Sequence, residues 1–383
     1  MMKKQIAVFG STGSIGKQTL SVCQAHRDLF AVKALVFGSN VELGAAQIRE
    51  FDPEIIGVFD IESAGTIAEM FPEKTVLAGS DVWSIAAFDS IDSVVNGVSG
   101  FDGVFPLINA LRAGKEVALA NKESVVCAGG LVHRAQEEGG GIILPVDSEQ
   151  SAIFQCLAAG RKADVSSIIL TASGGAFRDS SMDELANVTP EMAMKHPTWS
   201  MGKKITIDSA TLFNKGLEIM EAAFLFNMDA DHIKVLIHPQ SMVHSMVEFE
   251  DSSVIAQLSV PDMRLAIQYA LTFPERIESP AARLKLSEYA GLTFREPDTK
   301  RFPALDMAYE ALRAGLSMPV AYNSGNEVAV KRFTEGDIKF TEIPDCVCYT
   351  MNNIEKIQIN SMDELLYCDA QARRLASEYV VKR

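Results

Sequence analysis

The side chains best suited to chemistry lie close together in the segment HPTWSMGKKITIDSATLFNKGLEIME, at positions 196–221. A short loop at its start carries the imidazole of His196 and the indole of Trp199. The β-branched run at 205–207 then predicts a strand, which ends in the Asp-Ser pair at 208–209. The segment therefore brings two ring side chains and a hydroxyl group into one short stretch.

Further polar side chains follow this predicted strand and would suit an anionic ligand held beside a metal ion. They supply a hydroxyl, an amide, an ammonium group and two carboxylates: Ser209, Asn214, Lys215, Glu218 and Glu221. On a helix, the i, i+3 spacing of Glu218 and Glu221 puts both carboxylates on one face. For this segment alone, a solvated helix face after an ordinary strand remains the alternative.

A second pair of carboxylates follows another predicted strand. The apolar run at 142–146 is typical of a buried parallel strand, and Asp147, Ser148 and Glu149 come directly after it. In an extended segment residues i and i+2 point the same way, so both carboxylates could converge on one cation. Capping of the helix predicted at 150–159 is the competing explanation.

Three other segments either carry polar side chains or are predicted to form a long loop. The predicted strand that ends in small residues at 170–175 offers donors for a phosphate, or it forms a tight turn. Residues 188–202 lack a clear period and predict a long loop that serves as a lid. The alternating pattern at 235–247 predicts a single strand, and we interpret its histidines, His238 and His244, as structural.

These groups need a scaffold, and the N-terminal segment predicts a dinucleotide-binding unit. The apolar run at 5–9 enters the loop GSTGSIG at 10–16, and a helical pattern follows. Glycines let the backbone approach a pyrophosphate, and the helix N-terminus presents free N–H groups to it. The spacing is GxxGxxG instead of the commoner GxGxxG, so a plain turn between strand and helix remains the alternative.

The next strands predict a doubly wound parallel sheet. Apolar segments alternate with helical ones at 31–37, 55–59, 93–95 and 116–120. The Gly-Ser-Asn turn at 38–40 lacks the acidic residue that NAD enzymes usually place there, which favours NADP. Polar residues at 121–124 follow a strand end, where ligands of such sheets bind, although a helix cap would use the same residue types.

The composition indicates an acidic globular protein. The chain has 383 residues, 48% hydrophobic and 22% charged, which is enough for two or three domains. Its net charge of -15 argues against a nucleic-acid or anionic-membrane partner. No apolar run approaches a membrane span, and glycine interrupts the N-terminal run too early for a signal peptide. Six cysteines without a CxxC pair predict reduced thiols and a cytoplasmic location.

Six motifs along the chain together resemble the 1-deoxy-D-xylulose 5-phosphate reductoisomerase family. They are GSTGSIG, ANKES, PVDSEQSAIFQ, TASGGAFR, HPTWSMGKKITIDSATLFNKGLEIMEA and VPDMR, and they span essentially the whole chain. The resemblance implies an α/β fold with a Rossmann-like NADPH-binding domain at 1–146 and a central α/β catalytic and dimerisation domain at 147–273. A linker at 274–298 and a C-terminal helical bundle at 299–383 would follow, and the protein would be a homodimer.

The resemblance also implies a metal site and a substrate site. Asp147, Glu149 and Glu218 would bind one Mg²⁺ or Mn²⁺, with Glu221 as a supporting neighbour. The residues implied to be catalytic are Lys122, Glu149 and His196. Those implied to contact substrate are Lys122, Ser148, Glu149, Ser173, His196, Trp199, Ser209, Asn214, Lys215 and Glu218. Within that set, the positions that match phosphate-holding residues are Ser173, Ser209, Asn214 and Lys215.

The family's cofactor positions fall on a further set of residues. They are Thr12, Gly13, Ser14, Ile15, Gly38, Ser39, Asn40, Asn121, Glu123, Gly202 and Met263. Many relatives carry a basic residue beside the 2′-phosphate where this chain has Ser39, so the preference for NADP over NAD is expected to be narrower here. Trp199 and Met201 would lie on a lid that closes over the substrate.

The activity implied is metal-dependent isomerisation and NADPH-dependent reduction of 1-deoxy-D-xylulose 5-phosphate to 2-C-methyl-D-erythritol 4-phosphate, in non-mevalonate isoprenoid precursor biosynthesis. The substrate is a small phosphorylated sugar, and no nucleic-acid or membrane partner is expected. Two other functions stay open. An acyl-phosphate or semialdehyde reductase would need a cysteine nucleophile, for which Cys127 and Cys156 are available. A non-catalytic NADP-binding regulator would need no metal.

Overall fold

A computed structural model describes residues 3–195, 199 and 202–380 of the chain. The chain forms two compact units, each assembled from several segments. The first comprises Met1–Ser124, Gly130–Ser151 and Asp262–Ala282, and the second comprises Val125–Gly129, Ala152–Pro261 and Arg283–Arg383. Among the described residues, no helix combines the length and the apolar character needed to cross a membrane.

The first unit is built on a seven-stranded sheet of strand order β4-β3-β2-β1-β5-β6-β7, in which all neighbours are parallel. The strands are β1 (Lys4–Phe9), β2 (Phe30–Phe37), β3 (Ile55–Val58), β4 (Thr75–Ala78), β5 (Ser93–Asn96), β6 (Glu116–Leu119) and β7 (Ile142–Pro145). The strand order reverses between β1 and β5, which creates the switch point at which dinucleotides bind in such sheets. The predicted doubly wound sheet is confirmed, and β4 is an additional strand.

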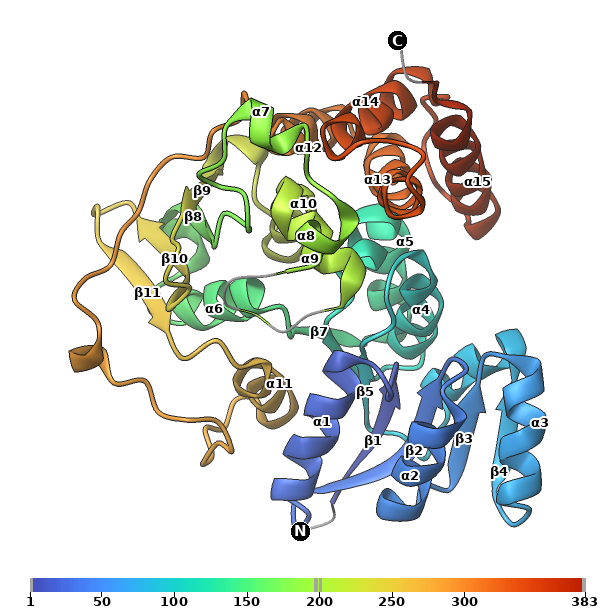
Figure 1. Cartoon of the computed structure of the whole chain (residues 1–383). Helices are drawn as coiled ribbons and strands as arrows, with labels where there is room; N and C mark the ends of the chain where they lie inside the picture. The colour runs from blue at the N-terminus through green and yellow to red at the C-terminus, as the bar shows by residue number, and fades with distance from the viewer. Residues whose placement is uncertain (1–2, 196–198, 200–201, 381–383) are drawn as a thin grey trace. The chain divides into compact units, whose positions relative to one another are not determined.

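Helices connect these strands, and Figure 1 shows the earliest of them in blue beside β1 to β4. They are α1 (Ser14–Ala25), α2 (Val41–Phe51), α3 (Ile61–Met70), α4 (Val104–Arg112) and α5 (Lys122–Gly139), with the 3₁₀ helices η1 (Gly79–Ala87) and η2 (Phe101–Gly103). A later helix, α11 (Met263–Thr272), returns to this unit and packs on α1. The unit therefore takes its last helix from a distant part of the chain.

The glycine loop after β1 allows the strand and the first helix to pack closely. The apolar side chains of β1 from Ile6 to Phe9 are fully buried. Gly10 has φ +77°, and a Cβ atom there would lie 2.5 Å from the carbonyl oxygen of Gly97. A Cβ atom on Gly16 would lie 2.3 Å from the carbonyl oxygen of Gly10. Both positions therefore need glycine to hold α1 against the strand ends.

The second unit contains a four-stranded mixed sheet of order β11-β10-β8-β9. Its strands are β8 (Val165–Ala172), β9 (Ile233–Ile237), β10 (Val243–Phe249) and β11 (Val254–Leu258). β8 is parallel to β9 and antiparallel to β10, and β10 is antiparallel to β11. The single strand predicted at 235–247 is wrong. A turn at 238–242 divides this segment into β9 and β10, which lie on opposite sides of β8.

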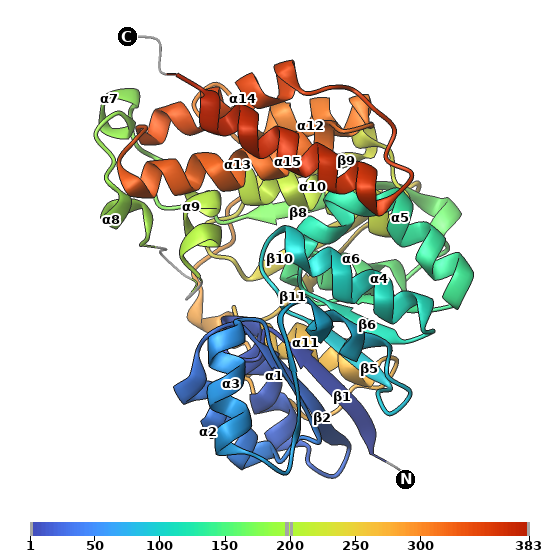
Figure 2. The same cartoon turned by 90° about the vertical axis from the view of Figure 1, so that its right-hand side faces the viewer.

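The remaining helices belong largely to the second unit and include those of the C-terminal region. They are α6 (Ser148–Leu157), α7 (Met182–Leu185), α8 (Pro190–Ala193), α9 (Lys203–Thr211), α10 (Phe213–Phe226), α12 (Ala304–Ala314), α13 (Met318–Glu335), α14 (Ile343–Asn353) and α15 (Met362–Glu378), with 3₁₀ helices η3 (Lys162–Asp164), η4 (Ala230–His232), η5 (Leu286–Glu288) and η6 (Phe340–Glu342). Figure 2 shows α13 and α15 side by side, and α13 also packs on α14. The predicted helical C-terminal region is confirmed.

The strand predicted at 205–207 is also wrong, because these residues lie inside α9. The hydroxyl of Thr206 donates a hydrogen bond to the carbonyl oxygen of Gly202, at 2.8 Å, so its donor is satisfied locally, at the start of the helix. Thr206 and Ile207 are buried among other parts of the second unit. Packing therefore overrides the β preference of the branched side chains.

Candidate functional site

The predicted pyrophosphate loop lies at the N-terminus of α1. Gly13 is the N-cap residue of this helix and leaves its first N–H groups without a side-chain cap. Gly13 and Ser14 are exposed, and Thr12 and Ile15 are partly exposed. The loop therefore presents backbone donors and the positive end of the helix dipole to solvent, as an anion site requires.

The predicted ribose-phosphate turn at 38–40 is exposed and lies beside an acidic residue that the sequence did not indicate. The side-chain oxygen of Asn40 caps α2 by accepting from the backbone N–H of Leu43, at 3.1 Å. The backbone N–H of Asp60 approaches the carbonyl oxygen of Gly38, at 3.4 Å. Hydrogen bonds from Ser63 lower the pKa of Asp60 below its usual value, so this carboxylate is ionised at neutral pH. Its position in the sequence, after the strand β3 and before a helical pattern, could have indicated Asp60 as the N-cap residue of α3.

Asn121 is a structural junction as well as a predicted cofactor residue. Its side-chain oxygen accepts from the backbone N–H of Ser124, at 2.9 Å, and so caps α5. Its amide nitrogen donates to the carbonyl oxygens of Val98 and Gly100, at 2.8 Å each, and to Glu123 at 3.1 Å. Asn121 therefore caps α5, as the capping alternative predicted. Its amide hydrogen bonds also hold the turn after β5.

The first pair of predicted metal ligands flanks the start of α6. Asp147 follows β7 and its carbonyl oxygen accepts from the N–H of Ser151, at 2.8 Å, whereas Ser148 and Glu149 already belong to the helix. The predicted extended arrangement of this segment is wrong, because the helix begins directly after Asp147. The carboxylate of Asp147 pairs with the ammonium group of Lys122, which is only 6% exposed. The hydroxyl of Ser148 donates to the carboxylate of Glu149.

The third predicted ligand, Glu218, lies in α10 and is 1% exposed. Its two oxygens accept from the side chains of Asn214 and Lys215, one turn earlier in the same helix. Glu221 is fully buried on the same helix. The predicted helix over these carboxylates is confirmed, and a buried carboxylate with an amide and an ammonium partner is not a solvated surface residue.

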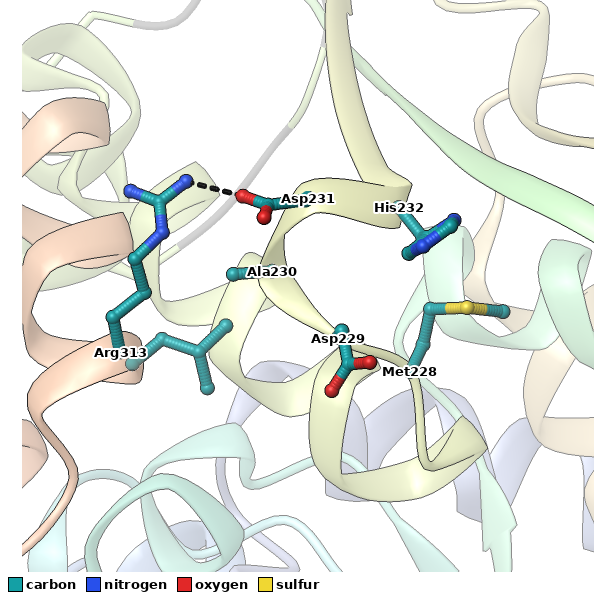
Figure 3. Close-up of a pocket in the computed structure, with 7 residues that line it drawn as sticks. Met228, Asp229, Ala230, Asp231, His232 and Arg313 are labelled. Atoms are coloured by element: carbon teal, nitrogen blue, oxygen red, sulfur yellow. Dashed lines mark hydrogen bonds and ion pairs between the residues drawn. The ribbon is translucent and has the colours of Figure 1, made fainter.

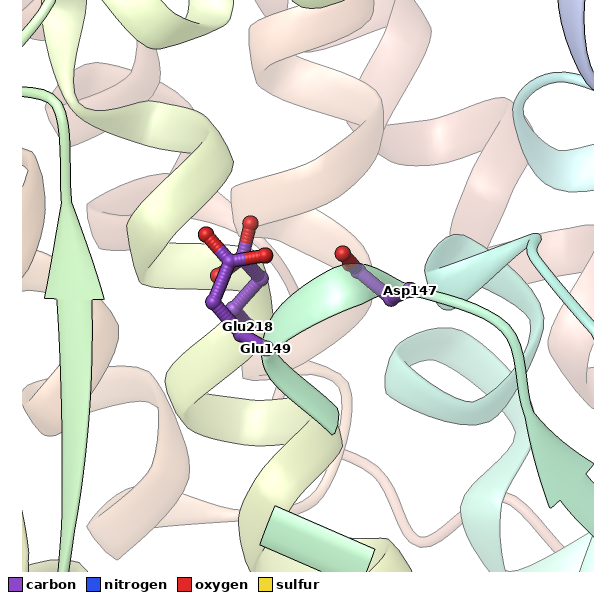
Figure 4. A group of neighbouring side chains, drawn as sticks. All are labelled: Asp147, Glu149 and Glu218. Atoms are coloured by element: carbon purple, nitrogen blue, oxygen red, sulfur yellow. The ribbon is translucent and has the colours of Figure 1, made fainter. Parts of the chain in front are cut away.

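Asp147, Glu149 and Glu218 form a group with the donor chemistry of a hard divalent cation (Figure 4). Each offers one carboxylate oxygen, and these oxygens all lie within 4.8 Å of one another. Oxygen ligands of this kind suit Mg²⁺ and Mn²⁺. The lysines at positions 122 and 215 balance part of the negative charge. The residues present therefore fit the metal that the sequence suggested.

Of the predicted phosphate residues, Ser173 and Ser209 lie at the turn after β8, whereas Asn214 and Lys215 lie on α10. Ser173 follows β8, and its hydroxyl accepts from the backbone N–H of Gly175, at 3.2 Å. Gly175 has φ +72°, and a Cβ atom there would lie 2.5 Å from the carbonyl oxygen of Ser209. The turn after β8 is therefore packed directly on α9. Arg178 approaches the carbonyl oxygens of this turn, at 3.4 Å, and adds a positive charge that the sequence did not single out.

Other predicted residues are placed individually. His196 and Met201 lie outside the described residues. The ring of Trp199 lies 6.1 Å from that of His244. Gly202 is the N-cap residue of α9. Met263 begins α11, whose N-terminus is capped by Asp262.

The turn histidine, His238, has the structural role that the sequence predicted. Its Nδ1 atom lies 3.0 Å from the carbonyl oxygen of Thr293, and its Nε2 atom accepts from the N–H groups of Met242 and Val243, at 3.2 Å. Its ring stacks on Phe294 at a centroid distance of 4.6 Å. The imidazole therefore ties the turn between β9 and β10 to a later segment.

A surface pocket of about 420 Å³ lies elsewhere in the second unit (Figure 3). Asp231 and Arg313 form an ion pair of 2.6 Å at its edge. Its lining residues are Met228, Asp229, Ala230, Asp231, His232, Leu312 and Arg313. Among the predicted site residues that the structure describes, none lines this pocket, which is therefore separate from them.

Comparison with known proteins gives the same family over nearly the whole chain. The family descriptions matched are 1-deoxy-D-xylulose 5-phosphate reductoisomerase at residues 6–129, its C-terminal domain at residues 143–226, and the DXP reductoisomerase C-terminal domain at residues 258–375. The 1-deoxy-D-xylulose 5-phosphate reductoisomerase of Chlorobium chlorochromatii is 50% identical, over 98% of this chain and 100% of that protein. The enzyme of Bacteroides fragilis is 45% identical, over 99% of both chains.

Solved structures agree with this result. The 1-deoxy-D-xylulose 5-phosphate reductoisomerase of Zymomonas mobilis in complex with NADPH is 39% identical and superposes with a TM-score of 0.92, over 98% of both chains. A DOX-P reductoisomerase in complex with NADPH, fosmidomycin and magnesium is 36% identical, with a TM-score of 0.92 over 98% of this chain and 97% of that one. This chain belongs to the 1-deoxy-D-xylulose 5-phosphate reductoisomerase family.

Proposed function

We propose that this protein isomerises 1-deoxy-D-xylulose 5-phosphate and reduces the product with NADPH to 2-C-methyl-D-erythritol 4-phosphate, in non-mevalonate isoprenoid precursor biosynthesis. The observation that carries this proposal is the group of three carboxylates, Asp147, Glu149 and Glu218. An NADP-binding regulator would leave this group without a purpose. The family relationship supports the same activity.

The carboxylate group is proposed to hold Mg²⁺ or Mn²⁺ against the substrate. A divalent cation there would act as a Lewis acid on the substrate's ketone and its neighbouring hydroxyl group. Lys122 and Glu149 are the groups proposed to move protons, and His196 is proposed to contact the substrate. The ammonium group of Lys122 already lies beside Asp147, so a positive charge is held at the edge of the metal site.

The substrate's phosphate is proposed to be held by Ser173, Ser209, Asn214 and Lys215. The glycine turn after β8 packs on α9 at Ser209, which supports a single site for these hydroxyl groups. Ser148 and Trp199 are proposed to contact the rest of the substrate. Holding the reacting groups in a fixed geometry is important here, because a rearrangement of the carbon skeleton must not release its fragments.

NADPH is proposed to bind along the carboxyl ends of the strands in the first unit. The pyrophosphate would lie on the loop at 12–15, and the 2′-phosphate would lie at the turn 38–40. Asn121, Glu123, Gly202 and Met263 are proposed as further cofactor contacts. The exposed N-terminus of α1 supports the pyrophosphate position.

The protein is proposed to be a cytoplasmic homodimer. β11 is an edge strand with exposed apolar side chains at Val254 and Ile255. The nearby segment of the linker also exposes large apolar side chains, at Leu286, Tyr289, Leu292 and Phe294. A second copy of the chain would bury these surfaces. None of the six cysteines forms a disulfide bond, which supports a reducing compartment.

We also propose that the functional division of the chain follows residues 1–146, 147–273, 274–298 and 299–383. In this division the first part binds cofactor, the second binds metal and substrate, and the last supports the second. The long return of α11 to the first unit is compatible with a cofactor contact at Met263.

A semialdehyde reductase is disfavoured by the state of its candidate nucleophiles. Burial raises the pKa of the Cys156 thiol to about 11, so it is protonated at neutral pH. Cys127 is buried as well, with 4% exposure. A nucleophilic cysteine needs the opposite environment, with access to substrate and a lowered pKa.

Product identification tests the proposed function. Purified protein would be incubated with 1-deoxy-D-xylulose 5-phosphate, NADPH and Mg²⁺, and the product identified by NMR spectroscopy. A branched 2-C-methyl-D-erythritol 4-phosphate supports the proposal. An unbranched reduced sugar phosphate would show reduction without isomerisation and would contradict it.

A further inference from the structure

Helix α13 of the C-terminal region contacts α9 and α10. These helices carry the proposed phosphate residues Ser209, Asn214 and Lys215. The amide nitrogen of Asn326 donates to Oδ1 of Asp208 on α9, at 2.8 Å. Both side chains are buried, Asn326 completely and Asp208 to within 1%. Asp208 directly precedes Ser209, so this hydrogen bond fixes α9 next to a proposed phosphate ligand.

One turn earlier on the same face of α13, Tyr322 holds the neighbouring helix. Its ring lies 5.0 Å from that of Phe213, the first residue of α10. Its hydroxyl donates to the carbonyl oxygen of Ala304, at 3.1 Å. A Cβ atom on Gly216 would lie 1.9 Å from this hydroxyl, so α10 approaches α13 as closely as glycine permits.

The two helices meet at a residue with an unfavourable backbone conformation. Leu212 lies between the two helices, as the C-cap residue of α9 and the N-cap residue of α10, with φ +64°, in the left-handed region that residues other than glycine rarely adopt. Such a joint persists only where its surroundings hold it. Asn326 holds the helix before the joint and Tyr322 holds the helix after it, so α13 sets the angle between them.

Asp208 is a buried carboxylate that the proposed chemistry does not use. Its second oxygen pairs with the ammonium group of Lys204, at 2.8 Å and one turn earlier in α9. A buried carboxylate is costly unless it is paired and hydrogen-bonded, and removing one partner exposes that cost. The contact with Asn326 is therefore a strong constraint on the position of α9.

We propose that Asp208 and Asn326 are positioning residues for the phosphate site. Their hydrogen bond holds α9 against α13, so that Ser209 on α9 and Asn214 and Lys215 on α10 face one phosphate group. The inference rests on the proposed function, because the phosphate contacts belong to it. The C-terminal helical region would thus support substrate binding by positioning α9 and α10, without contacting the substrate itself.

Steady-state kinetics of the full-length protein test this role. Asn326→Ala should raise the KM for 1-deoxy-D-xylulose 5-phosphate roughly tenfold and weaken inhibition by inorganic phosphate in parallel, with the KM for NADPH unchanged. Asn323→Ala is the matched control. Asn323 is equally buried in α13, but its amide donates to Glu327 of the same helix, at 3.2 Å. This variant should leave both substrate and phosphate affinity unchanged.

An exchange variant separates positioning from general loss of stability. Asn326→Asp alone places two carboxylates face to face and should weaken phosphate binding, whereas combining it with Asp208→Asn restores an amide-carboxylate pair and should recover it. An unchanged substrate KM in Asn326→Ala would overturn the inference. So would an equal rise in Asn323→Ala, or an exchange variant that recovers no affinity. If the unaltered protein neither turns over substrate nor responds to phosphate, the proposed function fails first.

Discussion

At the scale of single residues, two of the three proposed metal ligands are paired with lysines. Lys122 pairs with Asp147, and Lys215 with Glu218. A divalent cation brought to the same oxygens would compete with these lysines for the carboxylates. Asp147 and Glu218 are thus each neutralised by a nearby lysine, whereas Glu149 accepts a hydrogen bond from Ser148.

Glu218→Gln tests the metal assignment. The variant should lose metal-dependent turnover by at least roughly a hundredfold, because an amide is a weak ligand for a hard cation. NADPH binding, followed by fluorescence, should be unchanged, since no proposed cofactor contact is altered. Glu221→Gln, on the same helix but outside the carboxylate group, should keep a metal-dependent activity. Normal turnover in Glu218→Gln would rule out this ligand.

Asp60→Asn tests the effect of the unpredicted acidic residue on cofactor preference. The amide can still cap α3, but it removes an ionised carboxylate beside the turn at 38–40. The ratio of kcat/KM for NADPH to that for NADH should rise roughly two- to threefold, because a solvent-screened repulsion of the 2′-phosphate is relieved. Glu69→Gln, at the other end of α3, is the control for a change of charge alone. A ratio that stays constant or falls would show that Asp60 does not act on the 2′-phosphate.

The three proposed metal ligands illustrate what the sequence could and could not predict at this scale. The pair Asp147 and Glu149 and the residue Glu218 were each suspicious by type and by position after a predicted element. Nothing in local spacing joined them, because 69 positions separate Glu149 from Glu218 and only the fold, or a family resemblance, brings them together. Asp60 was missed for the same reason, since it follows β3 whereas its neighbour Gly38 follows β2.

At the scale of elements, long apolar strands and the glycine loop were predictable, and the segments with special functions were not. The inner strands of the parallel sheet, such as β3 and β5, are buried along their whole length, and such strands read as apolar runs. The segment at 205–207 has the residue types of a strand but forms a helix, since its contacts with α10 and α13 decide its conformation. Local preference is weak compared with such packing.

Asp262 gives a prediction for one element, the N-terminus of α11. Its side chain accepts from the backbone N–H of Arg264, at 3.0 Å, and from the guanidinium group. Hydrogen bonds from Arg264 lower the pKa of Asp262 below the usual value of 3.8, despite partial burial. The stabilisation is therefore present above the unfolded pKa and is lost as the pH falls through the lower folded pKa.

Asp262→Ala should accordingly lower the free energy of unfolding by about 1 kcal/mol at neutral pH. Urea unfolding at a series of pH values would measure the difference, which should shrink only below about pH 4. Asp262→Asn keeps an acceptor for the cap and should lose less. A difference that is independent of pH would mean that the charge of Asp262 contributes nothing.

At the scale of the whole molecule, the exposed apolar side chains of β11 and the linker are the features that a monomer does not explain. Ile255 is 38% exposed on an edge strand. Ile255→Glu should convert a dimer into a monomer of 41.6 kDa, because a carboxylate would be buried in the interface. Light scattering measures the mass. Leu366→Glu on α15, where the apolar side chain is 42% exposed, is the matched control and should stay dimeric. A wild-type protein of monomeric mass would contradict the proposed assembly.

The fold class of the molecule was predictable because its signals repeat along the chain. A Gly, Asn or Asp residue lies within two positions of the end of each strand of the parallel sheet, and the C-terminal region is helical in its periodic segments. The net charge argued against a nucleic-acid partner, but the composition carried no information on the substrate. That information came from motifs spread over the whole chain, which no single element contains.

The oxidation of NADPH by purified protein with 1-deoxy-D-xylulose 5-phosphate tests the proposed activity most directly. Absorbance would be followed with Mg²⁺ or Mn²⁺, with a chelator instead of metal, and with NADH in place of NADPH. We expect rapid loss of NADPH only when metal is present, and a slower but measurable loss of NADH, because Ser39 replaces a basic residue. NADPH consumption at the same rate in the presence of the chelator, or none under any condition, would contradict metal-dependent isomerisation and reduction by this protein.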